Sequence, residues 1–335
     1  VEGVIGRRAF VHGAAAVGMT KLLGVPSTEA ESPPETTTLR IGHSPSLCAA
    51  PQFVAEDLLR GEGFTSVKYV KSADAGPAQW RDLATGETDF NTAFSGPLLL
   101  RIDAQDPIVL LAGIHVGCFE LFGTQRIRAV RDLKGKTVAV WALQSVGHVF
   151  IAAMAAHVGL DPQKDIVWAV HSPEEGKRLL AEGKVDAYMA FPPDPQELRA
   201  NAVGHVVVNS AMDKPWSQYF CCTMVGNREF VRKHPVATKR VLRAFLKARD
   251  LCASEPERMA RLLVDRGYVK RYDYALQTLR DVPWNRSRDY DPEDTVRFYA
   301  LRLHEAGMMK SSPQKIIAQG TDWRFLNELK KELKG

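Results

Sequence analysis

The stretch Arg128–Leu160 reads RAVRDLKGKTVAVWALQSVGHVFIAAMAAHVGL and decides the fold class. Its pattern predicts a short helix closed by the left-handed residue Gly135, a strand over 137–141, and a helix that begins after Gln144 and Ser145. The strand is apolar throughout, as a strand covered on both faces requires. Ser145 is a natural N-cap, so the free N–H groups and the positive dipole end of the helix point beyond the end of the strand. Open α/β sheets bind ligands at such ends, and we expect the functional centre here.

Strands and helices alternate along the rest of the chain. Strands are predicted over 38–42, 66–70, 88–93, 107–115, 118–124, 166–170, 185–190, 206–208 and 218–225. Helices are predicted after Pro97 and over 51–60, 78–85, 173–182, 194–201, 227–233, 236–253, 256–266, 272–281, 292–306 and 322–333. This order predicts an α/β fold with mostly parallel sheets covered by helices on both faces, followed by an almost wholly helical C-terminal part.

A sequence echo indicates two similar lobes. One predicted helix ends at Gly86 and leads into GETDFNTA, and another ends at Gly183 and leads into GKVDAYMA. In both segments an aspartate, Asp89 or Asp186, stands early in the strand that follows. With 335 residues, the chain is long enough for two lobes that each bury a core.

Two phrases carry a family resemblance: DLKGK at 132–136, with the strand that follows it, and VGNREFVRKHP at 225–235. They resemble the sulfonate, nitrate and taurine (thiamine-precursor-like) family of periplasmic solute-binding proteins, which serve ABC importers. The resemblance implies a two-lobed periplasmic-binding-protein-like fold of type II, with a hinge of two crossover segments and C-terminal helices that pack on the first lobe. The implied segments are an export signal and linker over 1–37, a first lobe formed by 38–118 and 222–335, and a second lobe over 119–221.

The N-terminal 37 residues have the composition of an export signal. Arg7 and Arg8 form a twin-arginine pattern, which is followed by the weakly apolar run 13–19 and the small, polar run 26–38. This order predicts twin-arginine export to the periplasm, with cleavage near Ala30. The alternative is an amphipathic N-terminal helix that contains two arginines. No later segment approaches the length of a membrane-spanning helix, and we expect a soluble mature protein.

Composition and motifs exclude several functional classes. Hydrophobic residues make up 45% of the chain, charged residues make up 25%, and the net charge of +5 is spread without a basic block. We therefore expect no nucleic-acid partner. The five cysteines show no C-x-x-C motif and the nine histidines no H-E-x-x-H motif, so we predict neither a metal site nor a cofactor. No G-x-S-x-G motif is present, which counts against a hydrolase, and we predict no catalytic residues.

Cys118 and the pair Cys221 and Cys222 fall on the predicted hinge, where buried free thiols are favoured over a disulfide.

Three serines mark the predicted binding cleft. Ser44, Ser95 and Ser145 each follow a predicted strand and open a predicted helix. We expect these turns to converge on the polar end of one ligand, although each serine could also be a plain N-cap. The predicted ligand-binding residues are Ser44, Pro45, Ser46, Thr92, Phe94, Ser95, Gly96, Gln144, Ser145, Val146, His148, Ala190 and Phe191.

We therefore expect a monomeric capture protein rather than an enzyme, with a small-molecule ligand and an ABC permease as partners. The resemblance leaves the ligand open among sulfonate-, nitrate- and aromatic-acid-like solutes and a thiamine-pyrimidine precursor. One alternative is an enzyme that resembles the yeast pyrimidine synthase of thiamine biosynthesis, whose cysteine-rich motif is not reproduced by Cys221 and Cys222 alone. Another alternative is the sensory domain of a signalling protein. The predicted export signal favours the capture protein.

Overall fold

The computed structural model describes residues 31–44, 46–71 and 78–332. Most of the predicted export signal, residues 1–30, and the predicted site residue Pro45 lie outside these residues. Pro33–Gly335 form one compact unit, which contains all of the strands and helices of the described chain. Among those helices, none combines the length and the apolar character that crossing a membrane requires.

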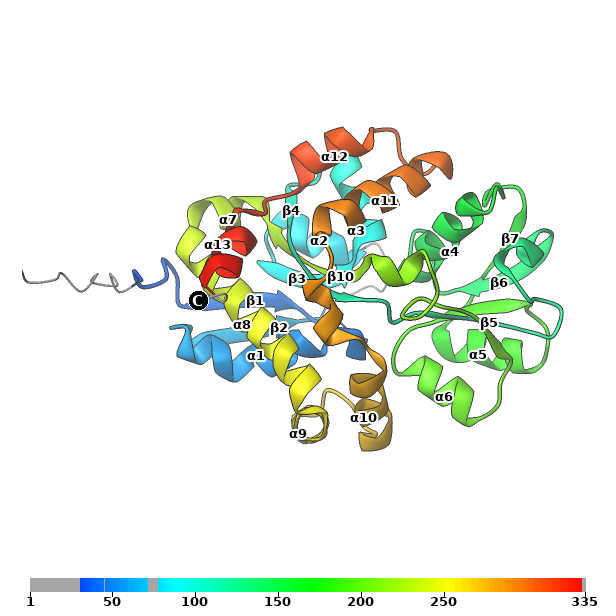
Figure 1. Ribbon diagram of the computed structural model, residues 1–335, viewed down its shortest axis with the longest axis horizontal. Coiled ribbons are helices and arrows are strands. Elements are labelled where there is room, and N and C mark those ends of the chain that lie inside the picture. Colours follow the sequence, from blue (N-terminus) through cyan, green and yellow to red (C-terminus); the bar gives the residue numbers. More distant parts are fainter. Residues whose placement is uncertain (1–30, 45, 72–77, 333–335) are drawn as a thin grey trace, which may run out of the picture. The chain divides into compact units, whose positions relative to one another are not determined.

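Two five-stranded sheets form the two lobes (Figure 1). The first sheet has the strand order β2-β1-β3-β10-β4 and consists of Ser66–Val70 (β2), Thr38–Gly42 (β1), Phe90–Phe94 (β3), Phe220–Asn227 (β10) and Ile108–Val116 (β4). The second sheet has the order β7-β6-β8-β5-β9 and consists of Ile166–Val170 (β7), Lys136–Val140 (β6), Ala187–Ala190 (β8), Glu120–Gly123 (β5) and His205–Asn209 (β9). In the described part of each sheet, four strands share one direction, and the fourth strand in the order is antiparallel to its neighbours. The predicted two-lobed α/β fold is confirmed.

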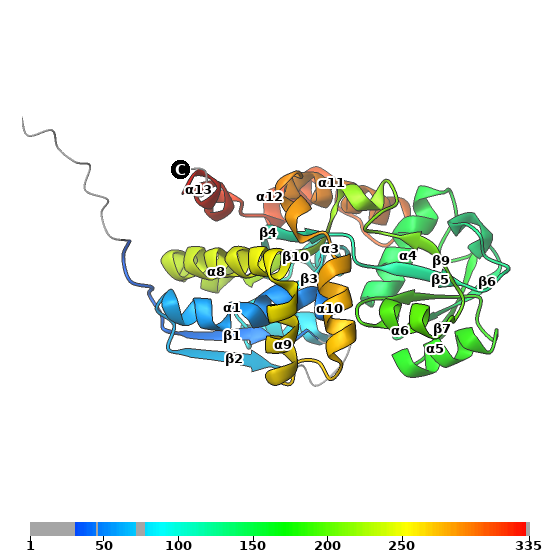
Figure 2. The ribbon, with the colours of Figure 1, turned by 60° about the horizontal axis from the view of Figure 1, so that its bottom comes forward.

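Helices cover both sheets (Figures 1 and 2). Those between and beside the strands are Ala50–Gly61 (α1), Ala78–Thr85 (α2), Ser95–Asp103 (α3), Val146–His157 (α4), Pro173–Ala181 (α5) and Asp194–Ala200 (α6). The C-terminal helices are Arg228–Lys233 (α7), Pro235–Ser254 (α8), Pro256–Asp265 (α9), Tyr272–Asp281 (α10), Pro292–Glu305 (α11), Pro313–Gly320 (α12) and Arg324–Glu332 (α13). Helices α1 and α8 pack side by side, whereas α4 and α5 pack against β8 of the second sheet.

Short helices complete the connections. Four 3₁₀-helices lie at Leu47–Ala49, Val130–Leu133, Trp216–Gln218 and Trp284–Arg288. The second of these is the predicted short helix, and Gly135 after it has the expected left-handed φ of 70°. Helix α12 was not predicted, although its sequence carries a start signal. Ser312 accepts a hydrogen bond from the N–H of Lys315, and a proline occupies the first turn.

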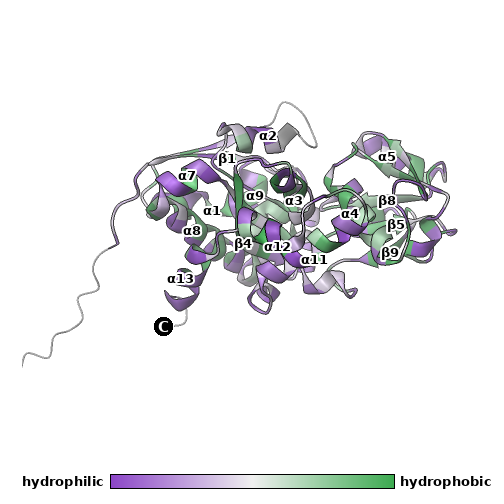
Figure 3. Ribbon diagram, turned by 90° about the horizontal axis from the view of Figure 1, so that it is seen from above, coloured by the Kyte–Doolittle hydropathy of each residue, from purple (hydrophilic) through white to green (hydrophobic). Residues whose placement is uncertain are grey.

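The hydrophobic side chains lie between sheets and helices. In the second lobe a small core packs α5 and α6 onto the sheet, and it includes Phe122, Leu179, Tyr188 and Leu198. A larger core continues from the first sheet into the side of the second lobe that carries α4. In Figure 3 the strands β5 and β8 are mainly hydrophobic, whereas α7 and α13 are mainly hydrophilic. Burial of these apolar faces is the main force that holds the elements together.

One aspartate joins three strands in each sheet. In the first lobe Asp89 accepts a hydrogen bond from the N–H of Arg40 at 2.7 Å, and its own N–H donates to the carbonyl of Arg40 at 2.7 Å. Asp186 does the same in the second lobe, with the N–H of Thr137 at 3.0 Å and the carbonyl of Thr137 at 2.7 Å. The carbonyl of each aspartate also accepts a backbone N–H at the end of the antiparallel strand, from Asn227 or from Thr124. The sequence echo therefore marks two equivalent structural positions, as predicted.

The chain crosses between the lobes through a close backbone contact. Gly117, which follows β4, has a φ of 47°, and a Cβ placed on it would lie 2.3 Å from the Cα of Ala211. The Oγ of Ser210 accepts hydrogen bonds from the N–H groups of Cys118 and Phe119, at 3.1 and 2.8 Å. The two crossing segments are thus locked together, and only glycine fits at the contact.

Removal of either strand-joining carboxylate should destabilise the protein. We expect Asp89→Ala and Asp186→Ala each to lower the free energy of unfolding by about 1–3 kcal/mol, because a backbone N–H loses its acceptor. Denaturant titration followed by circular dichroism measures this. The control is Asp289→Ala at an exposed position, where we expect a change within about 0.5 kcal/mol. Equal stability of all three variants would show that the aspartates do not support the sheets.

Candidate functional site

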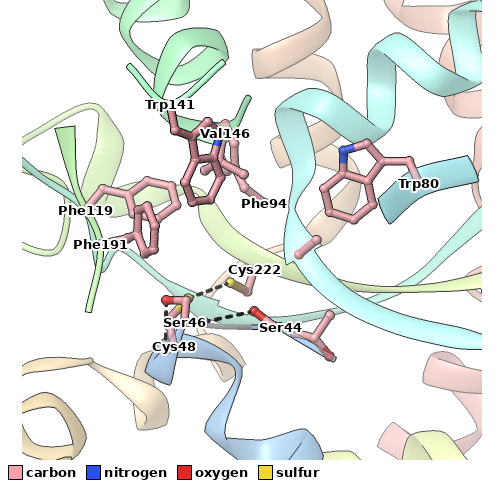
Figure 4. Close-up of a pocket in the computed structure, with 12 residues that line it drawn as sticks. Ser44, Ser46, Cys48, Trp80, Phe94, Phe119, Trp141, Val146, Phe191 and Cys222 are labelled. Atoms are coloured by element: carbon pink, nitrogen blue, oxygen red, sulfur yellow. Dashed lines mark hydrogen bonds between the residues drawn. The ribbon is translucent and has the colours of Figure 1, made fainter. Parts of the chain in front are cut away.

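A pocket lies between the lobes, at the carboxyl ends of β1 and β3 of the first sheet and of β6 and β8 of the second (Figure 4). We call it the aromatic pocket. Its described lining residues are Ser44, Ser46, Cys48, Trp80, Thr92, Ala93, Phe94, Phe119, Trp141, Val146, Phe191 and Cys222. Open α/β sheets present their ligand sites at this end of the strands. The space that these side chains leave has a volume of about 40 Å³, which is room for a few water molecules.

Aromatic rings form most of the wall. The rings of Trp141 and Phe191 meet edge to face with their centroids 4.9 Å apart, and those of Phe94 and Phe119 do so at 5.4 Å. Figure 4 shows Trp141, Phe119 and Phe191 on one side of the pocket and Trp80 facing them from the other. Among the described lining residues there is no lysine, arginine, histidine, aspartate or glutamate. The described wall of the pocket is therefore mainly aromatic and carries no charged side chain.

Two buried polar atoms in the wall have no hydrogen-bond partner within the described residues. They are the Oγ1 of Thr92, on β3, and the Nε1 of Trp141, directly after β6. Buried polar atoms are rarely left unpaired, because loss of their hydration is costly. These two groups come from opposite lobes, so one molecule held between the lobes could pair with both. This makes them the strongest sign of a ligand site in the described chain.

The lobes touch each other around the pocket. The carbonyl of Pro192, next to Phe191, accepts hydrogen bonds from the N–H of Leu47 and from the Oγ of Ser46, both at 3.0 Å. On the far side, the Nε2 of Gln196 on α6 donates to Asp281 on α10 at 3.0 Å. These contacts close the cleft, so a solute larger than a few waters can enter only when they open.

The structure distributes the predicted site residues over three hollows. Ser44, Ser46, Thr92, Phe94, Val146 and Phe191 line the aromatic pocket. Ser145 faces a separate small hollow beside Tyr188 and Met189, which also touches Phe191. Gln144 and His148 line an outer groove with Trp168 and Leu100. Successive residues at the start of α4 thus point in different directions, and the turn does not present a single binding face.

Three predicted residues, Ser95, Gly96 and Ala190, are buried outside these hollows. Ser95 is fully buried and its Oγ has no partner within the described chain. A Cβ on Gly96 would lie 2.8 Å from the Cγ1 of Val149, so glycine allows α3 to pack against α4. Ala190 ends β8 and pairs with Glu120 of β5. These three residues therefore pack within the protein and do not line the three hollows.

The predicted serine caps are confirmed in part. Ser145 accepts the N–H of His148 at 3.5 Å and is the N-cap of α4, as expected. In the first turn the cap is Ser46 rather than Ser44, because the Oγ of Ser44 instead accepts the N–H of Ser46 at 3.3 Å. Ser95 is the first residue of α3, and no side chain caps that helix. The alternative that each serine is a plain N-cap therefore holds for Ser145 and is wrong for Ser44 and Ser95.

Several pocket residues were not in the predicted set. They are Cys48, Trp80, Ala93, Phe119, Trp141 and Cys222. Trp141 directly follows β6, and Cys48 lies in the loop after β1, so a rule that includes every residue after a strand would have found both. Trp80 lies on α2 and carries no such signal, because only the tertiary packing brings it to the pocket.

His148 is a half-buried part of the α4 turn. Its Nδ1 accepts a hydrogen bond from the N–H of Gln144 at 3.2 Å, and its ring meets Trp168 edge to face at 4.5 Å. Burial lowers the pKa of His148 from 6.5 to about 4. Protonation would remove the acceptor that holds Gln144 at its positive φ of 62°.

Stability should therefore depend on pH through His148. Between pH 6.5 and pH 4 the unfolded chain binds a proton that the folded chain does not, so we expect a loss of stability as the pH falls through this window. The full loss is roughly 3–4 kcal/mol, at about 1.4 kcal/mol per pKa unit. In His148→Gln the amide oxygen can still accept the Gln144 N–H but does not titrate. Urea titrations at several pH values measure the free energy of unfolding of both proteins. Relative to the wild type, the variant should become more stable only below pH 6.5. A stability difference that does not change with pH would contradict this role.

Comparisons with known proteins agree with this geometry. The sequence matches the family described as NMT1-like over residues 32–264. No curated protein matches the chain. The alkanesulfonate-binding protein SsuA from Xanthomonas axonopodis pv. citri, bound to MOPS, is 18% identical with a TM-score of 0.68, over 86% of this chain and 99% of its own.

Two further solved structures have the same fold. The periplasmic nitrate-binding protein NrtA from Synechocystis PCC 6803 is 18% identical with a TM-score of 0.69, over 90% of both chains. The desulfurization enzyme DSZB is 16% identical with a TM-score of 0.61, over 89% of this chain and 100% of its own. At such identities the likeness establishes the fold, and it confirms the predicted resemblance to sulfonate- and nitrate-binding proteins at that level. The family match covers more than half of the chain, which therefore belongs to the NMT1-like family and has the two-lobed fold of periplasmic binding proteins.

Proposed function

We propose that this protein is the extracytoplasmic solute-binding component of an ABC importer. It captures a small solute between its lobes and delivers it unchanged to a membrane permease. The similar fold of the sulfonate-binding and nitrate-binding periplasmic proteins supports this function. The twin arginines Arg7 and Arg8 support export. Action as a monomer is part of the proposal.

The wall of the aromatic pocket favours one class of solute among those that the family resemblance leaves open. Transfer of a nitrate or sulfonate group into a site without a cation would leave a charge buried and unpaired, which is costly. A neutral aromatic or heteroaromatic ring can stack between Trp80, Trp141 and Phe191 instead. An acceptor atom on that ring can take the N–H of Trp141, and the hydroxyl of Thr92 can donate or accept. The two unpaired polar atoms on opposite lobes are the observation that carries this proposal.

An enzyme on the same fold is the second candidate. DSZB shows that this fold also serves an enzyme, and two thiols of the present chain, Cys48 and Cys222, line the aromatic pocket. Incubation with each stabilising solute, followed by mass spectrometry of the recovered solute, separates the two functions. Full recovery of unchanged solute supports capture, whereas a new product would support the enzyme.

A thermal-shift panel tests the solute class. We expect the neutral rings benzamide and aminopyrimidine to raise the Tm of the purified protein, because a ligand that binds only the folded state stabilises it. Benzoate, which has nearly the shape of benzamide but carries a charge, should stabilise less. Taurine and nitrate should have no effect. Stabilisation by taurine or nitrate, with none by the neutral rings, would contradict the proposed solute class while leaving solute capture in place.

Two variants test the contacts. Thr92→Val is near-isosteric and removes one polar atom, so we expect it to weaken binding of the most stabilising ring by about 2- to 13-fold, the value of one neutral hydrogen bond. Trp141→Phe removes the N–H together with part of the stacking surface, so its loss of affinity should be at least as large. Thr92→Val should not lower the stability of the solute-free protein, since its hydroxyl has no partner in the described chain.

The matched control is Ser145→Ala, which removes the α4 cap outside the aromatic pocket. This variant should lose about 0.5–2 kcal/mol of stability and keep its affinity. Calorimetric titration and denaturant titration measure the two quantities separately. If Ser145→Ala lost affinity while Trp141→Phe and Thr92→Val kept it, the solute would lie in the hollow beside Tyr188 instead.

A further inference from the structure

Four of the five cysteines gather at the base of the aromatic pocket. We call Cys48, Cys118, Cys221 and Cys222 the thiol cluster, and all four are buried, free thiols. The sulfur atoms of Cys48 and Cys222 are 3.5 Å apart, and those of Cys118 and Cys221 are 3.2 Å apart. Figure 4 shows Cys48 and Cys222 facing each other beneath the aromatic rings. The cluster combines the loop after β1, the first crossing and β10.

A histidine points into this cluster. One ring nitrogen of His115 and the sulfurs of Cys48 and Cys118 all lie within 4.8 Å of one another. In a tetrahedral zinc site with bonds of about 2.0–2.3 Å, neighbouring ligand atoms lie roughly 3.5–3.8 Å apart. The separations of the three atoms therefore exceed those of such a site by no more than about 1.3 Å.

The hydrogen-bond surroundings of His115 suit a metal ligand. Its Nδ1 lies 3.3 Å from the carbonyl of Val116, to which it can donate, and its Nε2 has no partner within the described residues. His115 is fully buried. Histidines that bind metals usually donate their second N–H to a carbonyl or carboxylate in this way, which leaves a lone pair on the other nitrogen.

The turn at Gly117 brings two of these ligands together. His115 and Cys118 are three residues apart, and the left-handed Gly117 between them turns the chain so that both side chains reach one point. Cys48 is held from the other side, where the Oγ of Ser46 lies 3.1 Å from its sulfur. Since Cys48 also lines the aromatic pocket, one side of the trio is open to the solute.

We propose that Cys48, His115 and Cys118 bind Zn²⁺, with the fourth coordination position facing the aromatic pocket. Two thiolates and an imidazole form a soft ligand set of the kind that zinc takes, and three protein ligands leave one position for water or solute. Cys222, in contact with Cys48, is the nearest further thiol. The site goes beyond the proposed solute capture. Two thiolates balance the charge of Zn²⁺, so the occupied site adds no net charge to the wall of the aromatic pocket.

Zinc binding at this site must release protons. Each cysteine that binds does so as a thiolate and gives up one proton, so the affinity should rise with pH. A surface site made of carboxylates, which are already ionised at neutral pH, would not show this dependence.

Cobalt and zinc titration of the reduced full-length protein tests the site. With Co²⁺ we expect one equivalent to bind and to show thiolate-to-cobalt charge-transfer absorption together with the visible bands of a tetrahedral ion. Zn²⁺ should displace the Co²⁺ and abolish these bands. In Cys48→Ser and Cys118→Ser the affinity for Co²⁺ should fall by more than about a hundredfold. Mutation of a residue that only hydrogen-bonds to a metal ligand already lowers metal affinity by about 10- to 100-fold, and loss of a ligand should cost more.

The matched control is Cys252→Ser, which changes a fully buried cysteine on α8 outside the thiol cluster and should bind cobalt like the wild type. His115→Gln serves as a second test, and circular dichroism of every variant confirms that it is folded. An absence of charge-transfer bands in the reduced wild type would overturn the proposal. Equal binding by Cys48→Ser, Cys118→Ser and wild type would assign the metal to surface groups and overturn it as well.

Discussion

The arrangement of the lobes depends on the close contact between the two crossing segments at Gly117. There the backbone of Gly117 lies against Ser210 and Ala211 without room for a Cβ, and the Ser210 hydroxyl accepts two N–H groups of the opposite segment. This contact fixes where β4 ends, where β5 begins and how close β10 passes. The aromatic pocket and the thiol cluster both lie next to it, because the strands that carry their residues converge there. A polar contact with no charge thus lies beside the cleft whose walls come from both lobes.

The fold could be predicted from local patterns, whereas the site could be predicted only in part. Strands such as β6 and helices such as α4 follow from apolar runs and caps. The repeated aspartates Asp89 and Asp186 indicate the two equivalent sheets from the sequence alone. The start of α4 is different, because Ser145, Val146 and His148 face three separate hollows. Their directions depend on the rotation of the helix against its neighbours, which sequence spacing does not give.

Long-range convergence explains why the thiol cluster has no sequence signature. Cys48 and Cys222 are 174 residues apart, and Cys118 and Cys221 are 103 apart, so neither pair forms a spaced motif. The charge pattern was similarly uninformative. The chain carries a net charge of +5, yet its described pocket wall is uncharged, because the basic side chains lie in surface ion pairs such as Arg178 with Glu175 and Glu182. Overall charge therefore describes the solvent-exposed surface of this protein and not its cleft.

The placement of the antiparallel strands has a consequence for synthesis. In the second sheet, β5 through β9 are contiguous and complete once residue 209 has been made. In the first sheet β10 lies between β3 and β4, so a gap separates these strands until residue 227 has left the ribosome. The lobe whose synthesis begins first is thus the last that can close its sheet. While the second lobe is made, β3 and β4 therefore lack the strand that pairs with both of them. Their unpaired edges are then exposed to the molecular chaperones that bind nascent chains.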